Sequence, residues 1–401
     1  MSRPEENEKP ASPAACMSVG PRAAAPNDMI VVGAGVIGLA IAWRAAQRGL
    51  RPVVLDAGEP GEGATGVAAG MLAPVTEADF GEEALLELNL ASARRYPDFV
   101  AELETGSGIA TAYRRSGTLN VAVDRDQAEE LARLHELQRS LGLQAQWLSA
   151  RQCRTMEPGL STRIAGGIDA PGDHQVSPRL LVSALRAALE RNGGRVRAHT
   201  RVDSLAVEGG ETAGVQLHSG DTLRARTVVL AAGARAGGVA VPPGARIPVR
   251  PVKGQILRLA GDRARPVCTR IVRTPEVYAV PRADGRLIVG ATVEERGFDA
   301  AVTAGGVLDL LRAGYEVLPG IAELELLHAA AGHRPATPDN EPVIGESTVP
   351  GLVWATGHWR NGVLLAPVTA DAVVSLVADG ELPDAVARFT PRRFATAEVA
   401  R

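Results

Sequence analysis

A short apolar run followed by three closely spaced glycines constrains the fold of this chain more than any other feature. Residues 29–32 are all apolar and predict a buried strand. The glycine motif Gly33-x-Gly35-x-x-Gly38 follows at once, then a helical pattern over residues 39–48 that Gly49 is expected to end. Residues 52–55 predict a second strand. This order predicts a βαβ unit, and so a parallel sheet.

The glycine motif predicts a loop that binds the phosphates of a dinucleotide. The first glycine permits a tight turn, the second lets a pyrophosphate approach the backbone, and the third lets the helix pack close to the strand. Asp56 ends the second strand near the spacing of about 20 residues at which an acidic residue binds a ribose hydroxyl. The charge of Asp56 disfavours the 2′-phosphate of NADP. The motif alone does not distinguish FAD from NAD, and a glycine-rich turn without a ligand is the alternative reading.

The rest of the chain alternates between two kinds of pattern. Residues 180–191 (helix), 195–199 and 227–231 (strands) continue the parallel α/β pattern. Small residues at Ala232 and Gly233 are typical of a strand end that contacts FAD, although an ordinary central strand would also fit. Residues 126–141 carry a leucine stripe typical of a helix. Residues 253–292 contain short β-rich runs, and the hairpin signal Asp284-Gly285 predicts an antiparallel sheet.

These patterns predict an α/β fold of two discontinuous domains. We expect the dinucleotide-binding domain to take residues 29–88, 148–247 and 328–390. The substrate domain, an α+β unit on an antiparallel sheet, would take residues 89–147 and 248–327. Residues 1–28 are rich in Pro, Ala, Ser and Glu and are expected to form a disordered tail, and residues 391–401 a C-terminal tail.

Composition argues against several other classes of protein. Aromatic residues make up 3% of the chain and the net charge is −3, which disfavours nucleic-acid binding by base stacking or by a basic surface. No apolar run approaches the ~18 residues of a membrane span, and no signal peptide is evident. Cys16, Cys153 and Cys268 are too scattered for a disulfide framework or a metal site. We therefore expect a cytoplasmic enzyme without a bound metal.

Several segments resemble the D-amino-acid oxidase superfamily, and most of all its glycine oxidase branch. They are residues 63–74 (GATGVAAGMLAP), 251–255 (PVKGQ), 277–282 (VYAVPR), 332–340 (GHRPATPDN) and 357–367 (GHWRNGVLLAP). The motifs occur in the order of that family and span residues 29–377. The resemblance implies a glutathione-reductase-type Rossmann domain that binds FAD, a small amino-acid or amine substrate, oxygen as a second partner, and a homo-oligomer.

The resemblance also implies roles for four residues around the substrate. Arg334 matches the arginine that binds the substrate carboxylate, and a planar guanidinium suits a carboxylate because it can donate two parallel hydrogen bonds. Tyr278 matches a tyrosine whose hydroxyl assists Arg334. Val293 matches the wall of the pocket near the substrate α-carbon, and Arg360 would line the pocket entrance or assist the flavin. Glu276 lies near the expected pocket mouth.

The cofactor contacts follow from the same motifs. The loop 358–364 resembles one whose N–H groups face the flavin pyrimidine, where reduced flavin carries negative charge. No cysteine follows Cys268, so the FAD is expected to be non-covalent, and Arg235 stands where the family usually has tryptophan. The expected cofactor-binding residues are Gly33, Gly35, Val36, Ile37, Gly38, Asp56, Thr65, Ala68, Ala69, Gly70, Met71, Val202, Ala232, Gly233, His358, Arg360, Asn361, Gly362, Val363 and Leu364.

The resemblance predicts oxidation of glycine, sarcosine or a D-amino acid to the imine. Hydride would pass from Cα to flavin N5, oxygen would be reduced to peroxide, and the product would serve thiamine thiazole synthesis. The sequence leaves three alternatives open. They are a related dehydrogenase with another electron acceptor, a 2-hydroxy-acid dehydrogenase on the same scaffold, and a flavin-binding protein without turnover. Lys253, the one lysine besides Lys9, has no role predicted from the sequence.

Overall fold

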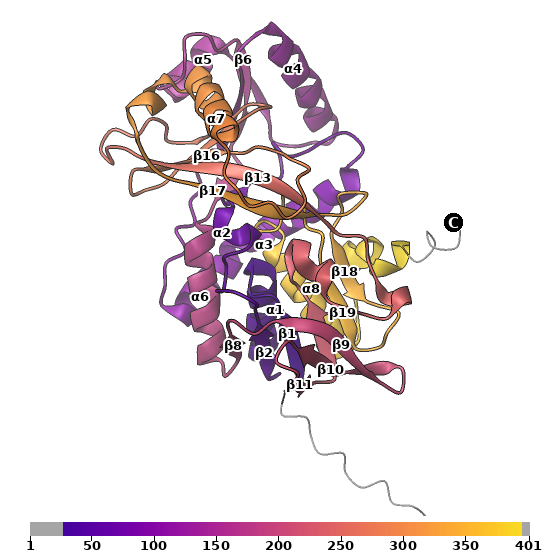
Figure 1. The fold of residues 1–401 in the computed structure, drawn as a ribbon. Helices are drawn as coiled ribbons and strands as arrows, with labels where there is room; N and C mark the ends of the chain where they lie inside the picture. Colours follow the sequence, from indigo (N-terminus) through magenta and orange to yellow (C-terminus); the bar gives the residue numbers. More distant parts are fainter. Residues whose placement is uncertain (1–26, 395–401) are drawn as a thin grey trace, which may run out of the picture.

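The first domain is built on a six-stranded sheet, visible in the lower half of Figure 1, and we call it the parallel-sheet domain. The computed structural model describes residues 27–394. Strand pairing is parallel throughout this sheet except between its first two strands, which are antiparallel. In spatial order its strands are β18 (Val343–Glu346), β19 (Leu352–Thr356), β12 (Thr227–Leu230), β1 (Met29–Val32), β2 (Pro52–Leu55) and β8 (Arg195–Arg197).

Each face of this sheet is covered by a different layer. One face packs in a single apolar core with α1 (Val36–Gln47), α3 (Glu83–Ser107), α6 (Pro178–Arg191) and α8 (Ala366–Asp379). The other face packs against a three-stranded antiparallel sheet of β9 (Val202–Glu208), β10 (Glu211–Leu217) and β11 (Thr222–Arg224). Strands buried on both faces are fully apolar, which is why residues 29–32 and 52–55 read as continuous apolar runs.

The second domain contains an eight-stranded sheet and lies above the first in Figure 1; we call it the eight-stranded domain. Its helices are α4 (Arg125–Ser140), α5 (Ala150–Met156) and α7 (Ala304–Val317). In spatial order its strands are β17 (Glu325–Ala336), β13 (Arg250–Ala260), β16 (Arg286–Gly290), β15 (Tyr278–Pro281), β14 (Ile271–Arg273), β4 (Thr118–Ala122), β6 (Gly166–Ala170) and β5 (Gln146–Ser149).

Short elements join the two domains. The helix α2 (Ala64–Val67) is followed by β3 (Met71–Leu72), which pairs with β7 (His174–Gln175). Single 3-10 turns complete the described chain: Gly233–Gly238, Pro243–Ala245, Pro319–Glu323, Asp384–Phe389 and Pro391–Phe394. Between residues 27 and 394, no helix combines the length and the apolarity that crossing a bilayer requires.

The predicted α/β fold with parallel and antiparallel sheets is confirmed, and the local signals explain its elements. Gly49 follows the C-cap of α1 with a φ of +81°, and it lies in a Schellman motif because Leu50 N–H donates to Ala45 O at 3.1 Å. The Asp284-Gly285 turn joins β15 and β16, which pair in antiparallel register. The leucine stripe at 126–141 corresponds to α4, in which Leu131 is buried.

The domain segments differ from the predicted ranges in three places. Residues 328–336 were assigned to the FAD domain, but they belong to β17, which pairs with β13 in the eight-stranded sheet. The helix α3 packs in the core of the parallel-sheet domain, although residues 89–107 were assigned to the substrate domain. Strands β5 and β6 pair within the eight-stranded sheet, although residues 148–170 were assigned to the FAD domain. The reason is physical: short strands give no sign in the sequence of which distant strand they pair with.

The predicted tails also differ at their inner ends. Residues 1–26 and 395–401 lie outside the described residues. Asn27 is buried and accepts a hydrogen bond from Arg195 at 2.9 Å, and Asp28 forms an ion pair with Arg51. At the other end, Pro391 is buried and Arg393 pairs with Asp339 at 2.8 Å. Residues 27–28 and 391–394 are therefore part of the packed fold.

Candidate active site

The glycine loop has the shape that a pyrophosphate requires. Gly33 has a φ of +108°, and a Cβ there would lie 2.5 Å from the carbonyl oxygen of Ala231. A Cβ on Gly38 would overlap the carbonyl oxygen of Gly33, so the helix approaches the strand as closely as it does only because this residue is glycine. Around Gly35 the nearest atom to such a Cβ would be Thr65 Oγ1 at 3.4 Å. The first and third glycines are thus required by packing, and the second keeps the helix start accessible.

Two side chains hold the loop in this shape. Asp56 accepts hydrogen bonds from the N–H groups of Ala34 at 2.6 Å and Gly58 at 2.9 Å. The buried Thr65 hydroxyl accepts one from Val36 N–H at 3.2 Å, at the start of α1. Each carboxylate oxygen of Asp56 keeps a second lone pair, which leaves the predicted bond to a ribose hydroxyl possible. Asp56 therefore also braces the phosphate loop, a role that the motif did not predict.

The loop of small residues after α2 lies between the two domains. Arg258 from β13 donates a hydrogen bond to Gly66 O at 2.5 Å. Arg282 donates to Val176 O at 3.0 Å and to Ala69 O. Burial lowers the pKa of Arg282 to about 10, so it stays charged at neutral pH. Two buried arginines of the eight-stranded domain therefore fix the segment that contains Ala68, Ala69, Gly70 and Met71.

The second predicted cofactor contact lies at the end of β12. Thr356 donates a hydrogen bond to Gly233 O at 3.0 Å, directly after Ala232. Val202 starts β9, and its side chain is buried in the core beneath the sheet. The guanidinium of Arg235 lies 4.7 Å from the ring centre of Phe298. Arg235 therefore packs against an aromatic side chain through a cation–π contact.

The predicted flavin-facing loop 358–364 is anchored from three sides. Trp359 N–H donates to Pro335 O at 3.0 Å, next to Arg334. Tyr96 and Ser92 of α3 donate to the carbonyl oxygens of Val363 at 3.0 Å and Leu364 at 2.6 Å. His358 contacts Thr369 Oγ1 at 3.1 Å, and burial lowers its pKa to about 3. His358 is therefore neutral at physiological pH and anchors the loop. Asn361, Gly362, Val363 and Leu364 lie in the turn just before α8.

One face of the eight-stranded sheet carries the predicted substrate-binding residues. Tyr278 lies directly opposite Gly290 on one side and Arg273 on the other. Gly290 lies opposite Ile256, which lies opposite Ala330. Arg334 lies four residues after Ala330 on β17. Because side chains alternate along a strand, Arg334 points to the same face of the sheet as Ala330. This face packs on Val67, Ala69 and Met71 and so faces the cofactor loop.

Arg334 and Tyr278 each extend over a glycine. A Cβ on Gly254 would lie 2.7 Å from the guanidinium carbon of Arg334, and one on Gly290 would lie 2.5 Å from the Tyr278 hydroxyl. Arg334 donates to the carbonyl oxygens of Thr292 at 3.0 Å and Lys253 at 3.4 Å. Burial lowers the pKa of Arg334, and Tyr278 and Glu77 partly counteract this effect. Burial raises the pKa of Tyr278 to about 12. Tyr278 therefore keeps its proton at neutral pH and can donate a hydrogen bond.

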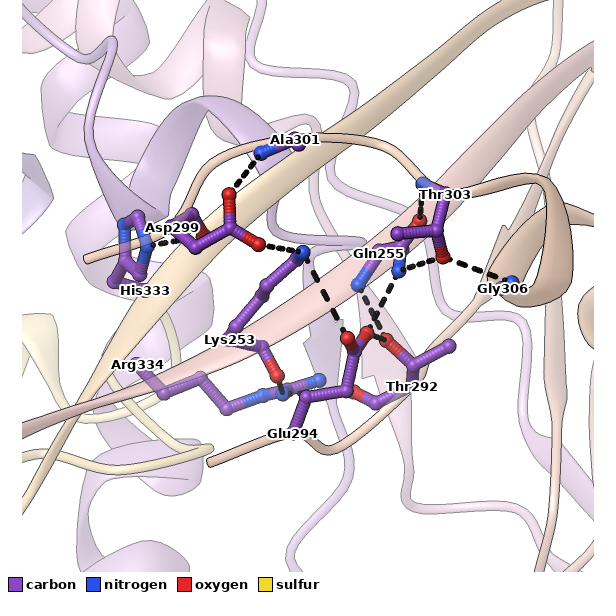
Figure 2. A network of polar contacts seen from close by, with 10 residues as sticks. All are labelled: Lys253, Gln255, Thr292, Glu294, Asp299, Ala301, Thr303, Gly306, His333 and Arg334. Atoms are coloured by element: carbon purple, nitrogen blue, oxygen red, sulfur yellow. Dashed lines mark hydrogen bonds and ion pairs between the residues drawn. The ribbon is translucent and has the colours of Figure 1, made fainter. Parts of the chain in front are cut away.

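A polar network beneath β13 holds those two carbonyl groups in place (Figure 2). The side chain of Lys253 is 0% exposed, and its Nζ lies 2.7 Å from Asp299 and 3.7 Å from Glu294. Glu294 accepts hydrogen bonds from Thr292 Oγ1 at 2.6 Å and Gln255 at 2.7 Å. The loop 291–303 is thereby tied to β13 on the face opposite Arg334. This network gives Lys253 a structural role that orients the carbonyl partners of Arg334.

An acidic residue that the sequence interpretation missed lies among the arginines of the site. Glu77 is 8% exposed and forms ion pairs with Arg273 and with Arg360, whose Nε lies 3.3 Å from Glu77 Oε2. Burial raises the pKa of Glu77, whereas the positive charges of Arg273, Arg360 and Arg334 lower it. The arginines have the larger effect, so the pKa lies below its usual value and the carboxyl group is ionised. Its segment is rigid because the buried Asp173 accepts hydrogen bonds from Val75 N–H at 3.0 Å and Thr76 N–H at 3.1 Å.

The structure brings most of the predicted substrate residues together and leaves one at the surface. Arg360 forms an ion pair with Glu77, and Tyr278 and Arg334 lie on the sheet face that carries Arg273, the other ion-pair partner of Glu77. Val293 directly follows Thr292, but its side chain is 66% exposed. Glu276 is also exposed. Among residues 27–394, no cluster of three or more His, Cys, Asp or Glu side chains could hold a metal ion.

The Gly254→Ala variant tests the contact between Arg334 and the sheet. The new methyl group would overlap the guanidinium, so Arg334 has to move. We expect KM for a carboxylate substrate to rise about tenfold while FAD stays bound, since a displacement of this size costs about 1.4 kcal/mol of binding. The measurement is steady-state kinetics together with the flavin absorbance. Gly305→Ala is the matched control, because no atom lies within 4 Å of a Cβ there. An unchanged KM in Gly254→Ala would contradict the assigned position of Arg334.

Comparison with known proteins agrees with this geometry. The model of the FAD dependent oxidoreductase family (DAO) matches residues 28–376. Glycine oxidase of Geobacillus kaustophilus is 34% identical over 91% of this chain and 97% of its own length. Its crystal structure superposes with a TM-score of 0.85 over 91% of this chain and 98% of that one.

A second kind of relative is longer than this chain. The bifunctional protein ThiO/ThiG of Synechocystis is 34% identical over 92% of this chain but only 54% of its own length. The chain therefore spans about half the length of these bifunctional relatives. The family model and the full-length match to a glycine oxidase confirm the predicted superfamily and resolve the choice between FAD and NAD. The chain belongs to the D-amino-acid oxidase family of FAD-dependent oxidoreductases.

Proposed function

We propose that this chain is an amino-acid oxidase that acts on glycine or a similarly small amino acid or amine. The observation that carries the proposal is that Arg334 and Tyr278 lie together on the face of the eight-stranded sheet that packs against Val67, Ala69 and Met71. A partly buried guanidinium and a protonated phenol together suit a substrate carboxylate. When bound, FAD would supply the oxidising chemistry, the acceptance of a hydride from the substrate Cα, with oxygen as the final electron acceptor and peroxide as its product.

The residues of this chain do the binding and orientation. Arg334 fixes the carboxylate, and Tyr278 donates a further hydrogen bond to it. The anchored loop 358–364 places N–H groups close to the start of α8, where negative charge is favoured. Holding the α-carbon at near-attack distance lowers the barrier by up to about 7–11 kcal/mol. No side chain has to act as a nucleophile.

The relatives support a role in supplying a biosynthetic intermediate. A glycine oxidase matches 91% of this chain, and a bifunctional protein ThiO/ThiG matches 92% of it. We infer that the imine of glycine serves thiamine thiazole synthesis here as well.

An anaerobic flavin-reduction panel tests the proposed function. The purified enzyme is mixed with glycine, sarcosine, D-alanine, D-proline or glycolate, and the loss of the yellow flavin colour is measured. We expect glycine to bleach the flavin, with ammonia as a product and with peroxide formed in equal amount once air is admitted. Bleaching by glycolate alone would instead favour a hydroxy-acid dehydrogenase. Bleaching by glycine without peroxide would favour a dehydrogenase with another acceptor.

The attachment of FAD can be tested separately. Cys153 and Cys268 are both buried in the core of the eight-stranded domain, away from the cofactor loop. We therefore expect heat or acid to release free FAD into the supernatant, which fluorescence measures. A yellow precipitate with a colourless supernatant would show a covalent bond and contradict this prediction.

A further inference from the structure

The substrate side of the site contains three arginines and one carboxylate. Arg273 comes from β14, Arg334 from β17, and Arg360 from the loop before α8. Glu77 comes from the turn after β3 and contacts two of the three. These four charged groups therefore come together from four separate elements that belong to both domains.

The three arginines are not equivalent. Arg273 and Arg360 both have Glu77 as a carboxylate partner, and Arg360 also lies 3.8 Å from Glu82. Arg334 has no carboxylate within ion-pair distance among residues 27–394, and it donates hydrogen bonds to two backbone carbonyls. A carbonyl carries only a partial charge, so the full positive charge of Arg334 is not balanced. One further carboxylate, that of the substrate, would balance the positive charge of Arg334.

Glu77 is firmly held in this arrangement. Its side chain is 8% exposed, and its Oε2 is buried without a hydrogen-bond partner among the described residues, although Arg360 Nε is 3.3 Å away. The preceding segment is fixed by three hydrogen bonds to Asp173, including one from Thr76 Oγ1 at 2.6 Å, and by Gln138, which donates to Val75 O at 2.9 Å. Rotating Glu77 away would remove the ion-pair partner of Arg273, whose side chain is 19% exposed, and one of the two partners of Arg360, which is costly.

We propose that Glu77 is a specificity-determining residue that occupies the place of a second acidic group and restricts the substrate to amino acids with a single carboxylate. This inference rests on the proposed function, because it assumes that Arg334 binds the carboxylate of the reacting amino acid. Glu77 and Glu82 together balance the charges of Arg273 and Arg360. A substrate with a second carboxylate would meet Glu77, and the repulsion between like charges would exclude it.

The Glu77→Gln variant tests this inference, with iminodiacetate as the probe because it contains a glycine unit and a second carboxylate. The substitution keeps the size of the side chain and removes the carboxylate that Arg273 and Arg360 share. We expect kcat/KM for iminodiacetate, divided by that for glycine, to rise at least tenfold over the wild-type ratio. Glu77→Asp keeps the charge and is expected to retain the wild-type preference. Glu87→Gln removes an exposed acid of α3 while Glu77 and Glu82 remain, and the ratio is expected to stay unchanged.

A binding measurement on the wild type keeps the inference testable if Glu77→Gln does not fold. Acetate is expected to perturb the flavin spectrum at far lower concentration than malonate, which adds a second carboxylate. Wild-type enzyme that binds malonate as tightly as acetate, or oxidises iminodiacetate as efficiently as glycine, would overturn the inference. An unchanged ratio in a folded Glu77→Gln variant would do the same. Wild-type flavin that no amine reduces would instead overturn the proposed function itself.

Discussion

Arg334→Ala is expected to raise KM for glycine at least about 100-fold while FAD remains bound. The substitution removes two charge-assisted hydrogen bonds to the substrate carboxylate, each worth about 1.5–3 kcal/mol, and every 1.4 kcal/mol corresponds to tenfold in binding. The predicted cofactor-binding residues do not include Arg334, so the variant is expected to stay yellow. The measurement is steady-state kinetics with glycine, together with the flavin absorbance of the purified variant.

Two further variants make this result specific. Arg334→Lys keeps the charge but loses the planar pair of donors, so we expect KM between those of wild type and Arg334→Ala. Arg312→Ala is the matched control, since Arg312 lies on α7, is 78% exposed and pairs only within its own helix. Unchanged kinetics in Arg334→Ala would mean that another residue binds the carboxylate.

Gly38→Ala is expected to yield a protein that does not hold FAD. The new methyl group would overlap the carbonyl oxygen of Gly33, and Val31 Cγ1 would lie 3.2 Å away. The start of α1 therefore has to move away from β1, and the N–H groups at that helix start leave the position that the pyrophosphate requires. We expect the purified variant to be colourless and to melt at a lower temperature than the wild type, which absorbance and thermal denaturation measure.

The control for this variant is another glycine in the same domain. Gly238 ends a 3-10 turn, and nothing lies within 4 Å of a Cβ built there. Gly238→Ala is expected to be yellow and to melt like the wild type. A Gly38→Ala protein that binds FAD with wild-type affinity would show that the close packing of α1 on β1 is not needed for the phosphate site.

The sequence predicted those parts of the molecule whose structure is determined by residues close to one another along the chain. The strand, glycine loop and helix at residues 29–48 follow from apolar runs and from backbone conformations that only glycine adopts easily. The hairpin at Asp284-Gly285 follows in the same way, because two residues determine a turn. The family motifs added Arg334 and Tyr278, which the structure places on one face of the eight-stranded sheet.

The parts that the sequence did not predict depend on long-range register. Glu77 is one of several acids in the segment TEADFGEE, and nothing local distinguishes it from its neighbours. Arg273 belongs to the site because it pairs with Tyr278 across two strands, and strand pairing cannot be read from either strand alone. Lys253 lies in the PVKGQ motif and is one of two lysines in the chain, but neither observation predicts where its side chain lies. Its burial and its two acidic partners became visible only once the loop 291–303 was placed.

The order of the strands has a consequence for how the molecule can be divided. Each domain is assembled from segments that lie far apart along the chain, because β1 pairs with β12 and β4 pairs with β14. No single cut of the polypeptide would therefore release either domain as an intact unit. Pairings between distant segments also form slowly, since a long loop has to close before the contacts stabilise it. We expect the enzyme to denature in one cooperative step, and expect that neither half, expressed alone, would yield a protease-resistant fragment.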